Sequence, residues 1–466
     1  MREQDDLLNM TEEDRQRVLA VEKMRALIEE GVNKKCLLSE MELEVEEQKR
    51  ALGQRAMDEK LASLKPEDGR PKGCPRCGKS SKRRAVAVER TFRSLSGEHT
   101  FKRDYYYCER CTRGFYPRDE FIGLPEHGTE TMELERRMAD FAVNDSYEEA
   151  SARWNFHYPL KTSANQFRQV VKRLGQRLDY ANENPTLLHA TIKPPPSTST
   201  ETLYVMNDGG MVPMRGAWQE CKLGVLFRDD EPLSEQGPRR GKTEDGRYVA
   251  VLGNQDEFRA ELQQALFAET RVRPKRIAWV ADGLPGNWNL ASLLAPNAIQ
   301  ILDWHHAVEN AFKCGKVLFE NSPIELAEWK KTTECLLWEE DSSVLQEQLK
   351  ECLLLAENQT QREALEDLLR YFNNNTSRMK YAEFRRLGLL IGSGPVESAH
   401  RHVIQIRMKK AGQHWGEQGG KQMARLRAAY RTTGPERFYR AIHWASRYGP
   451  RIKKLSMFEK RRASNR

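Results

Sequence analysis

The sequence lacks the features that place a protein in a membrane or outside the cell. No apolar run approaches the roughly 20 residues that cross a bilayer, and the opening residues, MREQDDLLNM, lack the apolar core of a secretory signal. The nine cysteines are an odd number, and four of them form two close pairs, which favours reduced thiols and a metal over disulfides. These features predict a cytoplasmic protein without a membrane partner.

Positive charge is concentrated at the C-terminal end of the chain. Residues 401–466 hold 18 Lys and Arg against three Glu, whereas the net charge of all 466 residues is only +8. A basic tail on a slightly acidic body favours a polyanionic partner, most often nucleic acid, although a solvated helix face produces the same pattern. The length predicts several domains rather than one.

The first 68 residues predict charged helices. Thr11 can cap a helix that ends near Gly31, and a second helical stretch, LSEMELEVEEQKRALGQRAMDEKLASL, carries only a thin apolar stripe. This pair is either a dimerisation arm or a surface helical pair. The stretch KPEDGRPKG then predicts a linker.

Two CxxC pairs predict a structural zinc site. They lie in CPRCGK and CERC, and two β-rich stretches, RAVAVERTFR and HTFKRDYYY, separate them. Two thiolate pairs joined by a hairpin form a zinc ribbon, in which Cys74, Cys77, Cys108 and Cys111 surround one Zn²⁺. Basic residues between the pairs predict a surface that faces DNA: Lys82, Arg83, Arg84, Lys102 and Arg103.

Three helices are predicted between residues 129 and 180. A short helix, a turn through HYPLK and a longer helix with Arg168, Lys172, Arg173 and Arg177 match a helix-turn-helix outline. Three-helix packing is also common in proteins that do not bind DNA. The Pro/Ser/Thr-rich stretch TIKPPPSTSTE marks a linker after it.

From residue 201 the pattern changes to alternating strands and helices. Five strands are predicted: a first with an apolar run that ends at Asp208, two more in CKLGVLFR and RYVAVLG, a fourth that ends at Asp282 and a fifth that ends at Asp303. Three antiparallel-type strands followed by βαβ crossovers predict a ribonuclease-H-like core.

The predicted fold is thus multidomain α/β. Its parts are N-terminal helices (1–68), a zinc ribbon (69–125), a helix-turn-helix-like domain (126–190), a linker (191–200), a mixed-sheet core (201–305 and 387–432) with an all-helical insertion (306–386), and a basic tail (433–466).

Three carboxylates form a candidate metal site in this core. Asp208 and Asp282 follow strands that lie side by side in such a fold, and Glu397 begins the helix after the insertion. Hard oxygen donors at one edge suit Mg²⁺ or Mn²⁺, and two such ions support attack on a phosphodiester. Asp-Gly is also a common turn dipeptide, so each aspartate alone is more often a turn residue.

The same residues resemble a known family. The blocks DGGMVPM, VADGLPGNWNL, LDWHHAVENA and GSGPVESAHRHVIQIRMKKAGQHW are similar to those of bacterial insertion-sequence DDE transposases, specifically the ISKra-type group. The resemblance runs from about residue 200 to 430. It implies that Asp208, Asp282 and Glu397 are the catalytic triad, and that Asp303 and His306 form the D-x-x-H element that follows the second aspartate. His305 departs from the family, in which many members have an aromatic residue there.

Two residues of this region keep alternative roles. In a catalytic role, His306 contacts the scissile phosphate or orients a water. In a structural role, it pairs with Asp303 and ties the insertion to the core. Trp415 either stacks on an unpaired base or is buried.

The resulting hypothesis is a DNA transposase that binds the terminal inverted repeats of its own element and joins cut ends to target DNA. It would use two Mg²⁺ or Mn²⁺ ions, carry a structural Zn²⁺, and act as a homodimer or higher assembly at the nucleoid. The predicted DNA contacts are Arg168, Lys172, Arg173, Arg407, Lys409, Lys410 and Trp415. The alternatives are a nuclease or resolvase with the same core, and a domesticated DNA-binding regulator.

Overall fold

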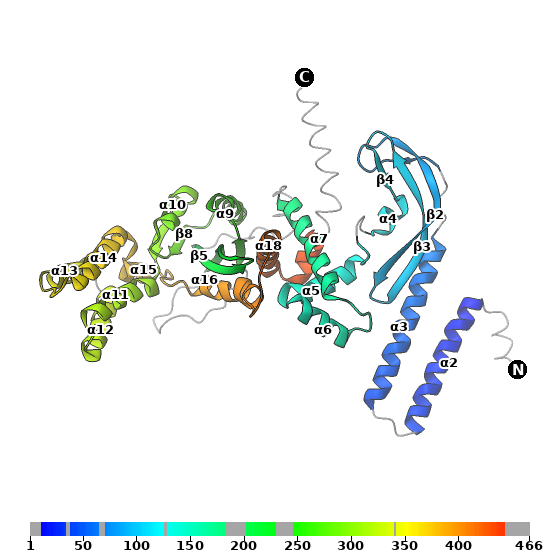
Figure 1. The fold of residues 1–466 in the computed structure, drawn as a ribbon, viewed down its shortest axis with the longest axis horizontal. Helices are drawn as coiled ribbons and strands as arrows, with labels where there is room; N and C mark the ends of the chain where they lie inside the picture. Colours follow the sequence, from blue (N-terminus) through cyan, green and yellow to red (C-terminus); the bar gives the residue numbers. More distant parts are fainter. Residues whose placement is uncertain are drawn as a thin grey trace, which may run out of the picture. The chain divides into compact units, whose positions relative to one another are not determined.

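The computed structural model describes residues 11–33, 38–64, 70–124, 128–182, 202–229, 246–339 and 342–442. The chain divides into two compact units: Met1–Ala139 with Ser151–Ser163, and Asp140–Ala150 with Ala164–Arg466 (Figure 1). The fold is mixed α/β, with a four-stranded sheet and a five-stranded sheet. Within the described ranges, no helix is both long and apolar enough to cross a membrane. The predicted linker at 191–200 and residues 443–466 of the basic tail lie outside the described residues.

The first unit is built on a long β-hairpin. The sheet order is β1 (Lys72–Gly73), β2 (Ser80–Ser94), β3 (Gly97–Cys108) and β4 (Arg113–Phe115), and all neighbours are antiparallel. Ser94 pairs with Gly97 at the turn, so the two β-rich stretches form the predicted hairpin. The pairing is irregular between Arg83 and Val88, where the backbone N–H of Ala87 donates to Asp104 Oδ1 at 3.1 Å. The short helix α4 (Pro117–Ile122) follows β4.

Two long helices, α2 (Glu12–Asn33) and α3 (Leu38–Ser63), precede this sheet, and α3 packs against β3. His99 of β3 links α3 to the hairpin: its Nδ1 lies 2.7 Å from Asp58 Oδ1 of α3, and its Nε2 lies 2.7 Å from Ser94 Oγ of β2. Because Ser94 is only 3% exposed, a substrate cannot reach its oxygen, so these three residues hold the helix rather than form a nucleophile. No residue of α3 is buried, so the surface helical pair and the dimerisation arm both stay predictions.

The three helices predicted after the sheet are present. They are α5 (Met132–Asn144), α6 (Tyr147–His157) and α7 (Ala164–Asn182). The turn between α6 and α7 is closed by Trp154 Nε1, which donates to the carbonyl of Leu160 at 2.8 Å, and by Ser151 Oγ, which donates to that of Thr162 at 2.7 Å. Their use as a helix-turn-helix remains a proposal.

The second unit contains the five predicted strands. They are β5 (Thr202–Met214), β6 (Ala217–Asp229), β7 (Arg247–Val251), β8 (Arg276–Ala281) and β9 (Ile299–Leu302), in the order β7-β6-β5-β8-β9. The first three are antiparallel, whereas β5, β8 and β9 run parallel. Helix α9 (Gln255–Glu269) lies between β7 and β8 in the chain, and α10 (Pro285–Leu294) lies between β8 and β9. The prediction that strands one and four lie side by side is confirmed.

One detail of the predicted core is wrong. Asp208 does not end a strand, because β5 continues to Met214 and Asp208 itself pairs with Leu223 of β6. The parallel pairing with β8 stops earlier, at Met206 and Val280. The apolar run in the sequence therefore marks the part of β5 that lies between β6 and β8. Beyond it, β5 continues but pairs with β6 alone.

The helical insertion follows β9 (Figure 1). Its helices are α11 (Trp304–Leu318), α12 (Pro323–Glu339), α13 (Ser342–Leu354), α14 (Gln359–Asn375), η1 (Thr376–Arg378) and α15 (Tyr381–Arg386). The two ends of the insertion meet, because the N–H of Trp304 donates to the carbonyl of Ile391 at 2.9 Å. The chain then continues through α16 (Gly394–Ala399), the π-helix η2 (His400–Gln405), α17 (Ile406–Met408) and α18 (Glu417–Thr433).

Helix α18 carries a buried arginine at the centre of this unit. Arg427 is 0% exposed, and its guanidinium donates to the carbonyls of Val143, His402 and Val403. Burial lowers the pKa of Arg427 to about 9, and the nearby positive charges of Arg431 and Arg407 add to the effect. The side chain joins three separate segments of the chain.

We predict that Arg427→Leu lowers the free energy of unfolding by about 2–4 kcal/mol, because three buried carbonyls lose their hydrogen-bond donor. Removal of the buried charge, which is itself costly, offsets part of this loss. Urea unfolding measures the change. The matched control is Arg431→Leu, one turn further along the same helix, where the side chain is exposed and the expected change is within about 0.5 kcal/mol. Equal effects of the two substitutions would contradict the role of Arg427.

Candidate active site and metal centre

Three aspartates stand in one row across the parallel strands. Thr202 pairs with Arg276 and Met206 with Val280, so the same register carried two residues further brings Asp208 opposite Asp282. Ala281 pairs with Leu302, and the next residues are Asp282 and Asp303. Because aligned residues of parallel strands point to the same face, the sheet itself brings these carboxylates to one edge.

Glu397 lies on helix α16, which packs against β5 and β6. Ser393 precedes the helix, and its Oγ donates to Glu397 Oε1 at 2.8 Å. The Glu397 side chain is exposed. Pro395 at the helix start sets the helical backbone.

A histidine that the sequence analysis did not single out faces Asp208. His400, at the beginning of η2, is 6% exposed, and its Nε2 lies 3.4 Å from Asp208 Oδ2. Its ring lies over Gly210, where a Cβ would come within 2.8 Å of the ring atoms. Burial lowers the pKa of His400, against the opposing charge of Asp208. Since Glu397 and His400 are three residues apart, they share one face of the helical segment, the face that covers Asp208.

The carboxylates influence one another electrostatically. Burial raises the pKa of Asp208, and the negative charge of Asp282 adds to the rise, while His400, the N–H of Gly209 and His306 oppose it. Asp282 Oδ1 accepts from Asn287 Nδ2 at 2.6 Å and from the N–H of Leu284 at 3.2 Å. Two neighbouring negative charges, one of them partly buried, favour a bound cation.

Asp303 is fully buried, and both of its oxygens have partners. Oδ2 accepts from the N–H of His306 at 3.1 Å and from its Nδ1 at 2.5 Å, and Oδ1 accepts from the N–H of Ser393 at 2.7 Å. Burial acts to raise the pKa of Asp303, but the hydrogen bonds and charge of His306 outweigh it and hold the pKa below its usual value. This geometry favours the structural alternative, in which Asp303 ties the insertion to the segment that carries Glu397.

His306 remains accessible from solvent. Its side chain is 38% exposed, and its hydrogen bond with Asp303 leaves Nε2 for another partner. That hydrogen bond raises the pKa of His306, and the negative charges of Asp303, Asp282 and Asp208 act in the same direction, against burial. A ring whose protonated form is favoured by neighbouring carboxylates suits contact with a phosphate.

The insertion contributes a tyrosine that the sequence did not reveal. A Cβ at Gly283 would lie 2.2 Å from the ring of Tyr371, so glycine after Asp282 makes room for this ring of α14. Burial raises the pKa of Tyr371 to about 12, and the charges of Asp282, Asp303 and Glu309 contribute. Its hydroxyl therefore stays protonated beside the carboxylates.

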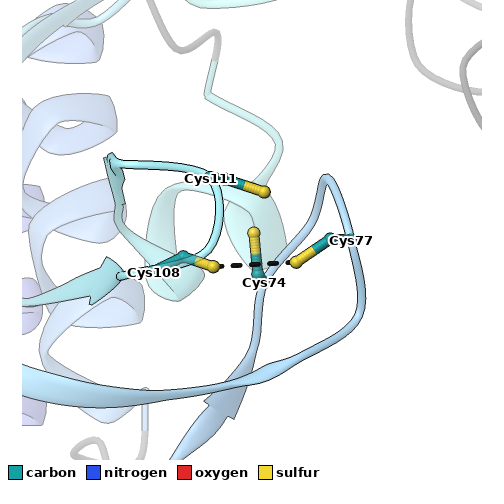
Figure 2. A group of neighbouring side chains, drawn as sticks. All are labelled: Cys74, Cys77, Cys108 and Cys111. Carbon is teal, nitrogen blue, oxygen red and sulfur yellow. Dashed lines mark hydrogen bonds between the residues drawn. The ribbon is translucent and has the colours of Figure 1, made fainter.

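The cysteines form the second candidate centre. Over the described ranges, Cys74, Cys77, Cys108 and Cys111 are the one group of three or more His, Cys, Asp or Glu residues whose ligand atoms all lie within 4.8 Å of one another (Figure 2). Cys77 and Cys108 are 3.6 Å apart at sulfur, close to the roughly 3.8 Å between sulfurs of a tetrahedral Zn²⁺ site. The aspartates and Glu397 do not converge to this degree, as expected for like charges that repel.

Each cysteine pair lies in a tight turn of the same construction. The residue after each pair has a left-handed backbone, with φ of 73° at Gly78 and 49° at Thr112. The N–H of Cys111 lowers the pKa of Cys108 to about 6, whereas the side chain of Cys77 and burial raise the pKa of Cys111 to about 12. A cation is therefore needed to hold four thiolates together, and the all-sulfur donor set fits zinc.

Two predicted DNA contacts are buried. Arg407 is 0% exposed, donates to the carbonyl of Ala142 at 3.1 Å, and lies over the rings of Tyr147 and Trp415. Trp415 is 5% exposed, and its Nε1 donates to the carbonyl of Met408 at 3.1 Å. The prediction that Arg407 contacts DNA is therefore wrong for this structure, because the side chain is buried. For Trp415 the structure favours the buried alternative.

The other predicted contacts differ in exposure. Lys409, Arg168 and Lys172 are exposed, and Arg173 is half-buried. Lys410 forms an ion pair with Glu149. Of the basic residues of the hairpin, Lys82 and Lys102 are exposed, whereas Arg103 is used internally by Asp119 and Tyr116. Arg83 and Arg84 pair with Asp104 and Glu109.

We predict about one Zn²⁺ per chain, and its loss in Cys74→Ser, because three thiolates bind the ion less well than four. Metal analysis of freshly purified, unchelated protein measures both. Cys335→Ser is the control, since this exposed cysteine lies outside the cluster and its loss leaves the zinc content unchanged. Wild-type protein without zinc would refute the site.

The His306–Asp303 pair predicts a pH-dependent stability. A histidine whose pKa is raised by folding stabilises the protein below its unfolded pKa of about 6.5, and the effect is lost as the pH rises through the folded value. The stabilisation is lost again in acid, when Asp303 takes up a proton at its lowered pKa. His306→Asn should therefore cost most near pH 5–6 and less at pH 9, measured as the free energy of unfolding. His305→Asn, at the exposed neighbouring position, serves as the control, and the same profile there would argue against the pair.

Comparison with known proteins places the chain in a family. No curated protein sequence matches it. A solved structure titled "Drosophila P element transposase strand transfer complex" aligns with 69% of this chain and 96% of that one, at 8% identity and a TM-score of 0.32. That likeness is weak, and no conclusion is drawn from it. The family model described as "Uncharacterised protein family (UPF0236)" matches residues 32–447, which is most of the chain. The chain therefore belongs to the UPF0236 family.

Proposed function

We propose that this protein is a DNA transposase that cuts and joins DNA at a two-metal site formed by Asp208, Asp282 and Glu397. The observation that carries the proposal is the row of aspartates across β5, β8 and β9, with the helix of Glu397 packed against β5. The strand order, with strands one and four parallel and adjacent, supports a ribonuclease-H-like core. The resemblance of the surrounding blocks to ISKra-type transposases supports the choice of reaction.

The donor set fits hard divalent ions. All three side chains offer carboxylate oxygens, and the negative charge of Asp282 contributes to the raised pKa of Asp208. Mg²⁺ or Mn²⁺ bound here supplies an activated water or 3′-hydroxyl and stabilises the leaving oxygen. The chain's own residues would do the rest: His400 lies against Asp208, Ser393 donates a hydrogen bond to Glu397, and His306 would present a ring nitrogen to the phosphate.

DNA binding would use surfaces in both units. Exposed Lys82 and Lys102 on the hairpin of the first unit, and Arg168, Lys172 and Lys409 in the second, are available for phosphates. The C-terminal basic residues add to the positive charge of the chain. Sequence-specific recognition of terminal repeats rests on the helices α6 and α7.

We predict that wild-type protein joins a duplex carrying the terminal inverted repeats that flank its gene to plasmid DNA in the presence of Mn²⁺. Asp208→Asn and Glu397→Gln should reduce joining to background while repeat binding persists, because each removes an oxygen ligand and no DNA contact. A gel-based strand-transfer assay measures joining. Mn²⁺ at 100 times its Kd should also stabilise the wild type by about 2.7 kcal/mol, and the variants by less.

Asp256→Asn and Glu417→Gln are the matched controls, since both side chains are exposed at the first turns of α9 and α18. They should join DNA normally. Cutting without joining would identify the nuclease alternative, and repeat binding without cutting would identify the regulator. Near-normal joining by Glu397→Gln would remove that residue from the metal site.

A further inference from the structure

A chain of hydrogen bonds runs from the core of the sheet to Asp282. Trp279 Nε1 donates to Asn207 Oδ1 at 2.8 Å, Asn207 Nδ2 donates to Asn287 Oδ1 at 2.6 Å, and Asn287 Nδ2 donates to Asp282 Oδ1 at 2.6 Å. Trp279 is 0% exposed and Asn207 is 4% exposed, so the first link is shielded from water. The chain connects β8, β5 and the first turn of α10.

The direction of this chain is fixed at its buried end. An indole N–H is a donor only, so the amide of Asn207 must turn its oxygen toward Trp279. Its NH₂ group then faces Asn287, which must in turn present its own oxygen and direct its NH₂ at the carboxylate. Reversing any one amide would place two donors or two acceptors against each other at both of its ends.

The residues also occupy positions that the sheet dictates. Asn207 aligns with Ala281, so it points to the face of the sheet opposite Asp208 and Asp282. Trp279 lies two residues before Ala281 and shares that opposite face. Asn287, on the helix that begins just after β8, closes the path around the end of the strand.

We propose that Trp279, Asn207 and Asn287 form a positioning relay that locks Asp282 Oδ1 and leaves Oδ2 as its metal-binding oxygen. Oδ1 receives Asn287 and the N–H of Leu284, so both donors hold the same oxygen. The carboxylate is thereby oriented before a cation arrives, and less freedom is lost on binding. The relay rests on the proposed function, because it assigns a role to Asp282 as a metal ligand.

The test is Mn²⁺ binding, followed by the electron paramagnetic resonance signal of free Mn²⁺. Asn287→Leu keeps a similar shape but cannot donate, and it should weaken Mn²⁺ binding about 10–100-fold, as is typical when a group behind a metal ligand is lost. Asn289→Leu, an exposed asparagine of the same helix, is the control and should bind as the wild type does. Raising Mn²⁺ to saturation should restore joining in Asn287→Leu, whereas Asp282→Asn should stay inactive.

The relay also predicts how two changes combine. Asn207→Leu should weaken binding to a similar extent, and the double variant should be no more than about threefold weaker than either single variant, because a relay broken once is already broken. Multiplied effects would mean two independent structural losses and would overturn the relay. The relay would also be overturned if the wild type binds Mn²⁺ and Asn287→Leu binds it with the same affinity. If the wild type neither binds Mn²⁺ nor cuts DNA, the proposed function fails and the relay with it.

Discussion

The parallel pairing of β5 with β8 is the constraint on which the candidate active site depends. It aligns residues far apart in the sequence, and the same register continued by two residues brings Asp208 and Asp282 to one edge. The segments on either side of the site are then fixed relative to this pair: α16 packs against β5, and the insertion begins directly after β9. The stability of the sheet, rather than attraction among the acidic groups, holds the like charges near one another, since their own interaction is repulsive.

The space around the carboxylates is made by glycines. A Cβ at Gly209 would lie 2.1 Å from Glu220, one at Gly210 would lie 2.8 Å from His400, and one at Gly283 would lie 2.2 Å from Tyr371. In each case the missing side chain lets another element reach the edge of the sheet: β6, η2 or α14. The Asp-Gly dipeptides that resemble turns in the sequence therefore allow close approach.

Local patterns were sufficient for much of this protein. Short apolar runs identified all five strands of the core, and spacing identified the four cysteines that the structure brings together. Local patterns could not distinguish a basic residue on the surface from one in the core. Arg407 is buried because a carbonyl and aromatic rings from distant parts of the sequence surround it. His400 and Asn287 were missed for the same reason, since their partners lie on other elements. The roles of Asp208, Asp282 and Glu397 stay predictions.

The closed base of the helical insertion has a consequence for how this protein can vary. A backbone hydrogen bond joins Trp304 to Ile391, and Asp303 accepts a hydrogen bond from the N–H of Ser393. The chain therefore leaves the core and returns to it at neighbouring points. Loop-closure entropy grows only slowly with length, so a longer or shorter excursion from the same two anchor points costs little. An insertion of a different length could therefore begin and end at the same two residues, and Tyr371 and His306 are the side chains that the present insertion places at the candidate active site.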